Sequence, residues 1–80
     1  MDKAKNLVSA VLNIPQGEIR DEASAENTGG WDSLAVMQLL VSLEEEYEIR
    51  ISIKEIDSLK SVYGISRLIA KIQKSENGNS

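Results

Sequence analysis

Three segments of this chain repeat their apolar residues at intervals of three and four, the spacing of a helix with one buried face. The segments run from about Asp2 to Leu12, from Asp32 to about Tyr47, and onward from Ser61. The chain of 80 residues has room for one small core, which the three faces must share. We therefore predict an all-α fold, a small bundle of three main helices plus one short helix, with a long first connector. The apolar faces are Ala4, Leu7, Val8 and Val11; Val36, Leu39, Leu40, Leu43 and Tyr47; and Val62, Ile65, Leu68, Ile69 and Ile72.

The residues at the ends of these segments are typical of helix boundaries. The run Ile14-Pro15-Gln16-Gly17 ends the first helix. Asp32 is placed to cap the second helix, and Trp31 before it is placed to pack on Val36 as a hydrophobic staple. Ser61 is placed to cap the last helix, whose first turn is weakened by a glycine.

The long first connector, residues 18–31, is polar and acidic, with two adjacent glycines near its end. A connector of this length in a small domain is usually functional or partly ordered by packing, and we expect Ile19 to anchor it in the core. We assign residues 1–74 to one domain. The last residues, 75–80, have nothing to bury, so we expect a disordered tail.

The stretch YEIRISI, residues 47–53, alternates apolar and polar residues as a strand does. A strand needs a partner, and no second segment of the chain has this pattern. We therefore interpret the stretch as an extended connector that is pinned to the core by Ile49 and Ile51. It leads to a short helical turn at about Lys54–Ser58.

The chain contains no cysteine and no histidine, which limits the chemistry that it can perform. It lacks thiolate nucleophiles, thiolate and imidazole metal ligands, and the commonest general base. Ser33 has no histidine to activate it, so we expect neither an enzyme nor a metal site. No apolar stretch reaches membrane-spanning length and the N-terminal residues lack a cleavage signal, so we expect a soluble, cytoplasmic protein without a membrane partner.

Charge is distributed unevenly along the chain, whose formal net charge is −4. Residues 18–48 hold nine acids and one base, a balance of −8, whereas the remainder holds four acids and eight bases, a balance of +4. The acidic part would repel a phosphate backbone, which argues against a nucleic-acid partner. Such clustering instead favours an exposed surface that steers basic partners.

An apolar strip formed by Leu34, Met37 and Val41 lies outside the core-facing arc of the second segment. Glu45 and Glu48 continue its line towards the end of the helix. The ordinary role of such a strip is to pack against a neighbour, here the short helix or the long connector. The alternative is a docking surface with apolar anchors and an acidic rim, which the charge distribution favours.

Ser33 opens the second segment, where its hydroxyl would be exposed at the positive end of a helix. A phosphate ester at this position would be stabilised by the backbone N–H groups there. Serine is common at helix starts, however, and by itself this position is more typical of a capping or neutral residue.

The stretch GGWDSLAVMQLLVSLEEEYEI, residues 29–49, resembles the prosthetic-group segment of the acyl carrier protein family, in which Asp-Ser-Leu opens the second helix. The stretches VSAVLNIPQGEI, LEEEYEIRIS and LKSVYGISRLIAKI extend the resemblance along nearly the whole chain. It implies that Ser33 bears 4′-phosphopantetheine, attached covalently from coenzyme A, with Asp32 and Leu34 as flanking recognition residues. It also implies that partner enzymes recognise the apolar strip together with Glu44, Glu45 and Glu48.

We expect a monomer, and the partners that the resemblance implies are a phosphopantetheinyl transferase and acyl-transferring, ligating or condensing enzymes with basic docking patches. The chain departs from the commonest fatty-acid carriers, because Ala35 and Gln38 replace frequent acids, Glu48 a frequent glycine and Ser52 a frequent proline. GGWDSL is more similar to free-standing carriers of specialised pathways, such as polyketide, nonribosomal peptide or modified-sugar assembly. An aminoacyl or peptidyl carrier is the alternative within the class, and a non-covalent helical adaptor is the alternative outside it.

Overall fold

The computed structural model describes residues 2–78, with side chains described to residue 74. All the regular elements in this part of the chain are helices. Three α-helices, α1 (Asp2–Leu12), α2 (Ser33–Tyr47) and α3 (Val62–Gly78), are joined through two 3₁₀ helices, η1 (Gln16–Glu18) and η2 (Ile53–Lys60). Among these residues, Ser24 and Ser61 form one isolated antiparallel β-bridge, and no strand is formed. The prediction of a small all-α bundle is confirmed.

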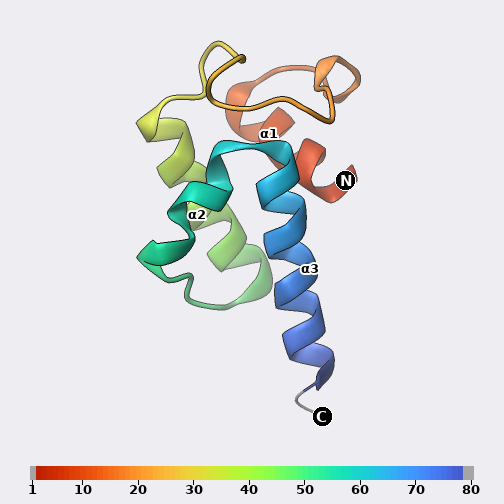
Figure 1. The fold of residues 1–80 in the computed structure, drawn as a ribbon, viewed down its shortest axis with the longest axis vertical. Coiled ribbons are helices and arrows are strands. Elements are labelled where there is room, and N and C mark those ends of the chain that lie inside the picture. The colour runs from red at the N-terminus through yellow and green to blue at the C-terminus, as the bar shows by residue number, and fades with distance from the viewer. Residues whose placement is uncertain (1, 79–80) are drawn as a thin grey trace.

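The two shorter packing partners, α1 and η2, each contact both α2 and α3. Figure 1 shows η2 crossing between the longer helices, while the chain from α1 to α2 passes over one end of the bundle. In the described part of the chain, no helix combines the length and apolar character needed to cross a bilayer.

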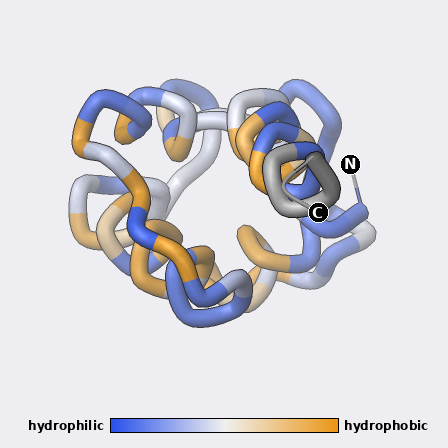
Figure 2. The backbone as a smooth tube through the Cα atoms, turned by 90° about the horizontal axis from the view of Figure 1, so that it is seen from below, coloured by the Kyte–Doolittle hydropathy of each residue, from blue (hydrophilic) through white to orange (hydrophobic). Residues whose placement is uncertain are grey.

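The core consists largely of the predicted apolar faces. All five residues of the α3 face are buried, and the remaining predicted residues of α1 and α2 are either buried or packed against the core. Seen along the bundle, hydrophobic stretches from separate parts of the chain surround a common centre (Figure 2). Five buried residues lie outside the predicted faces: Ala35 on α2, Ile19 and Ala23 in the first connector, and Trp31 and Leu59 in the segments that lead into α2 and α3.

The predicted caps of α2 and α3 are confirmed. The Asp32 carboxylate accepts the backbone N–H of Ala35 at 3.0 Å, and the Ser61 hydroxyl oxygen accepts that of Gly64 at 2.9 Å. Both members of the predicted staple, Trp31 and Val36, are buried in the core. The side chains of Asp32 and Ser61 thus satisfy N–H groups that a helix start leaves without a backbone partner.

Helix α1 ends at Leu12 as predicted, but the residue that ends it is Asn13. The backbone of Asn13 is left-handed, with φ 59°, and the next N–H, of Ile14, donates to the Ser9 carbonyl at 3.2 Å. This arrangement closes a helix without glycine, because asparagine tolerates the left-handed region better than most residues. Pro15 instead precedes η1, and Gln16 and Gly17 lie within it.

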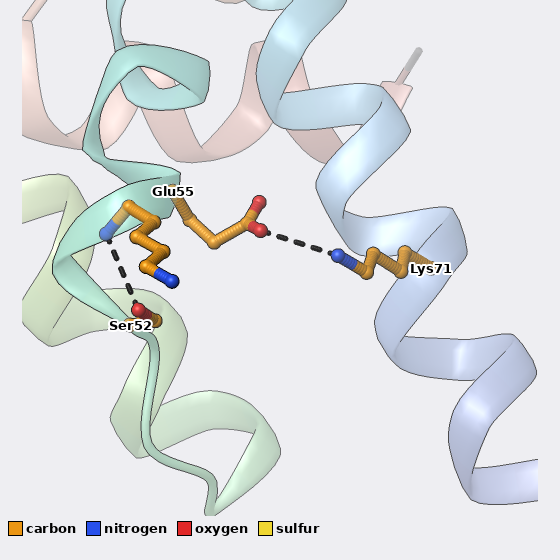
Figure 3. A network of polar contacts seen from close by, with 4 residues as sticks. Ser52, Glu55 and Lys71 are labelled. Atoms are coloured by element: carbon orange, nitrogen blue, oxygen red, sulfur yellow. Dashed lines mark hydrogen bonds and ion pairs between the residues drawn. The ribbon is translucent and has the colours of Figure 1, made fainter.

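The predicted helical turn at Lys54–Ser58 is too short. The observed η2 runs from Ile53 to Lys60 in 3₁₀ geometry, and the Ser52 hydroxyl oxygen accepts the Lys54 N–H at 3.2 Å at its start. The fully buried side chain of Leu59 anchors the last turn of η2 in the core. Figure 3 shows a further tie, in which the Lys71 ammonium of α3 donates to the Glu55 carboxylate at 3.2 Å.

The extended connector before η2 is confirmed, since Ile49 and Ile51 are partly buried against the core. The chain turns into it at Glu48, whose left-handed backbone has φ 52°. The N–H groups of Glu48 and Ile49 both donate to the Glu44 carbonyl, which closes α2.

The long first connector is fixed to the junction of η2 and α3. Ile19 is buried as predicted. The Ala25 N–H donates to the Lys60 carbonyl at 2.7 Å, and the Val62 N–H donates to the Ala23 carbonyl at 3.0 Å. Between residues 19 and 31 the connector forms turns and contains no helix, a point that the sequence does not decide.

An ion pair also holds this connector to α1. The ammonium of Lys5 bonds the Asp21 carboxylate and lowers its pKa below the ordinary value, first by hydrogen bonding and then by charge. Because the pKa of Asp21 is lowered, the pair stabilises the fold above the ordinary pKa and loses this effect as the pH falls through the lowered value. At neutral pH the Asp21 carboxylate is therefore ionised.

The backbone of α3 is described to Gly78. Residues 79 and 80 of the predicted tail lie outside the described residues, and the domain limit at residue 74 stays a prediction.

The close approach of α3 to η2 requires a glycine. A Cβ atom on Gly64 would lie 2.4 Å from the Ser58 carbonyl oxygen and 2.9 Å from the Ser61 Oγ. We expect Gly64→Ala to lower the free energy of unfolding by about 1–3 kcal/mol, although alanine favours a helix by about 1 kcal/mol. Urea denaturation measures this change. The matched control is Gly17→Ala, where nothing lies within 4 Å, and equal effects of the two substitutions would contradict the steric explanation.

The left-handed backbone of Glu48 predicts the opposite result for a substitution to glycine. A non-glycine residue in this region is disfavoured by about 1 kcal/mol or more, so we expect Glu48→Gly to raise the free energy of unfolding by about 0.5–1 kcal/mol. The control Glu48→Gln removes the charge but keeps the side chain. If urea denaturation shows the same gain for both variants, the charge and not the backbone is responsible.

Candidate functional site

Ser33 occupies the first position of α2, and its side chain is exposed. The residue two positions earlier, Trp31, is 3% exposed, and its indole Nε1–H donates to the Leu59 carbonyl at 3.0 Å. Asp32 caps the helix from its N-terminal side. The start of α2 is thus fixed to η2 through Trp31, while the Ser33 hydroxyl faces outwards.

A cleft of about 440 Å³ opens beside Ser33, between the start of α2 and the later turns of η2. Most of its walls are apolar, and Asp32 and Lys60 are the charged residues that line it. The Lys60 ammonium lies 3.2 Å from the Asp57 carboxylate, one turn earlier on η2. The lining consists of Ala25, Trp31, Asp32, Ser33, Val36, Met37, Ile56 and Lys60.

The apolar strip is not buried beneath η2 or the first connector. The exposed fractions of Leu34, Met37 and Val41 are 67%, 45% and 48%, which contradicts the packing interpretation. Large apolar side chains with this exposure, aligned on one helix, are typical of a contact surface. Glu45 and Glu48 are exposed as well, at the end of the helix away from Ser33.

A second cleft, of about 570 Å³, lies on the other side of the apolar strip, between α1 and α2. Met37 lines both clefts, and Val41 lines the second one. The apolar strip therefore forms a ridge between two shallow clefts. The residues of the second cleft are Ala10, Val11, Met37, Gln38, Val41 and Ser42.

Glu44 differs from the other acids predicted to meet a partner. Its side chain is half-buried, and its carboxylate accepts the backbone N–H of Ile51 at 2.8 Å. The carboxylate thus supports the connector that leads from α2 to η2. Nothing in the sequence indicates this bond, because it depends on where the connector returns in space.

The two positions of α2 at which this chain lacks a frequent acid of the commonest carriers differ in burial. Ala35 is 4% exposed and belongs to the core, so a small apolar side chain fits there. Gln38 is exposed and lines the second cleft. The upper part of α2 therefore presents an uncharged surface between Asp32 and the acids at its other end.

The geometry around Ser33 suits an attached phosphate ester. Its hydroxyl is exposed, and it stands at the N-terminus of a helix of 15 residues, where the helix dipole and free N–H groups favour a negative charge. The cleft beside it offers room for an attached group and one cationic side chain, Lys60. These features fit a phosphate-linked prosthetic group.

Comparison with protein-family models agrees with this geometry. The model described as a phosphopantetheine attachment site matches residues 2–69, which include α1, α2, η2 and the first half of α3. Members of this family hold 4′-phosphopantetheine by a covalent bond and meet phosphopantetheinyl transferases and acyl-handling enzymes. The match covers most of the chain, so the protein belongs to the family of phosphopantetheine-bearing carrier proteins.

Proposed function

We propose that this protein is an acyl carrier protein whose Ser33 bears the 4′-phosphopantetheine. The observation that carries the proposal is the exposed Ser33 hydroxyl at the start of α2, within a chain of the phosphopantetheine family. The prosthetic group supplies a thiol on a flexible arm, which holds an acyl group as a thioester. The protein's own contribution is to anchor this arm at a fixed point and to present it to enzymes.

Ser33 and its neighbours have separate roles in this proposal. The Ser33 oxygen takes the phosphate, whose negative charge is stabilised by the N-terminus of α2. Asp32 caps the helix and so keeps the hydroxyl at its tip. Leu34, the most exposed residue of the apolar strip, lies directly beside the attachment point, where a modifying enzyme has to dock.

We propose that partner enzymes dock on the apolar strip and on the exposed acids Glu45 and Glu48. Leu34, Met37 and Val41 offer a small apolar contact, and the acids attract basic patches over a longer distance. A carrier has to meet several enzymes in turn and leave each one quickly. A narrow ridge with electrostatic steering suits this task, because steering raises the association rate without a large, slowly separating interface.

We propose acyl groups as the cargo, in a specialised biosynthetic pathway. The GGWDSL stretch supports a specialised pathway but is shared with nonribosomal peptide carriers, so it does not separate an acyl cargo from an aminoacyl or peptidyl one. Loading assays with acyl-adenylating and amino-acid-adenylating enzymes separate the two cargo classes. The family match favours a covalent carrier over a helical adaptor, and carriers of this kind are typically not catalytic. The cytoplasmic location and the monomeric state stay predictions.

The attachment is tested by incubation with coenzyme A and a phosphopantetheinyl transferase, followed by intact mass measurement. We expect the wild-type chain to gain one phosphopantetheine group and Ser33→Ala to gain none, because the acceptor hydroxyl is removed. Ser42→Ala, on the same helix, serves as the control and is expected to be modified like the wild type. Modification of Ser33→Ala, or none of the wild type, would refute the proposal.

The docking surface is tested by the rate of the same modification. We expect Glu45→Lys to lower kcat/KM about fivefold at low salt, since it reverses a charge in line with the apolar strip. Glu46→Lys is the matched control, because this exposed acid is its neighbour on α2 but points about 100° away. The difference between the variants is expected to shrink at 0.5 M salt, about three times the ionic strength of a cell. Equal rates for both at low salt would count against steering through this edge of α2.

A further inference from the structure

We propose that Lys60 binds the phosphate of the prosthetic group, so that its ammonium neutralises the negative charge introduced at Ser33. This inference rests on the proposed attachment at Ser33 and adds a residue from a different element, η2. Lys60 and Ser33 line the same cleft, and Lys60 is the one base among the residues that line it. The other charged residue of the lining is Asp32, which repels a phosphate.

The backbone of Lys60 is fixed relative to Ser33. Its carbonyl accepts the Ala25 N–H at 2.7 Å, and the preceding residue, Leu59, is fully buried and accepts the Trp31 indole N–H at 3.0 Å. Trp31 stands two residues before Ser33. Two hydrogen bonds therefore fix the backbone at Lys60, one to the first connector and one to the residue that precedes the α2 cap.

Among the residues that the structure describes, the partner of the Lys60 ammonium is Asp57, in an exposed ion pair. The ammonium lies 3.2 Å from Asp57, but the side chains of Lys60 and Asp57 are 54% and 86% exposed. An ion pair this accessible to water contributes little, so the ammonium can exchange it for a phosphate at small cost. A lysine ammonium has three N–H donors, which allows it to bind both groups at once.

The surrounding charge explains why a counterion is needed at this position. Residues 18–48 hold nine acids and one base, and a phosphodiester on Ser33 adds a further negative charge to this part of the chain. The N-terminus of α2 offsets part of the charge. Lys60 comes from outside the acidic segment and supplies a full positive charge on the opposite wall of the cleft.

The test compares apo and holo forms of the full chain, with the attachment at Ser33 verified by intact mass in each variant. The variants are Lys60→Met and the control Lys54→Met, which removes the same charge from an exposed residue of η2 outside the cleft. At low salt we expect attachment to lower the melting temperature of Lys60→Met by about 2 °C more than that of the wild type. Lys54→Met is expected to respond to attachment as the wild type does. Nuclear magnetic resonance of the wild type should show a larger shift of the Lys60 Cε signal than of the Lys54 Cε signal on attachment.

The possible results separate this inference from the proposed function. Attachment at Ser33 with equal melting shifts in all variants, or with no larger signal change at Lys60 than at Lys54, would overturn the role of Lys60 alone. A failure of attachment at Ser33 would refute the proposed function, and the inference would fall with it. A melting difference that disappears at 0.5 M salt would support it, because screening weakens an exposed charge pair.

Discussion

The hydrogen bond from the buried Trp31 indole to the Leu59 carbonyl is the contact on which the arrangement of the functional site depends. It joins the residue before the α2 cap to the last turn of η2, across 28 positions of sequence. A buried indole N–H without an acceptor would be costly, so the contact is strongly specified once the side chain enters the core. It places Ser33 and the residues of η2 on two walls of one cleft.

The features predicted correctly are those that a local pattern determines. The apolar faces of α1, α2 and α3 follow from helical spacing, because only one side of each helix reaches the core. The caps at Asp32 and Ser61 follow from the need of a helix start for an acceptor side chain. The exposure of Ser33 and of the apolar strip also follows from position on the helix, since these residues lie away from the buried face.

The features that the sequence could not provide depend on where distant segments meet. The length of η2 is set by the burial of Leu59 and by the close passage of Gly64 over Ser58. The role of Glu44 depends on the return of the connector, which brings the Ile51 N–H to its carboxylate. The opposite wall of the Ser33 cleft, formed by Ile56 and Lys60, lies more than 20 residues later in the sequence and has no motif of its own.

Trp31 also provides an intrinsic fluorescence probe of the site around Ser33. It is the single tryptophan of the chain, it lines the cleft, and it stands two residues from Ser33. Indole emission responds to the polarity and mobility of its surroundings, and no other residue here contributes that signal. Changes beside Ser33 can therefore be followed by intrinsic fluorescence, without a dye that would obstruct the surface under observation.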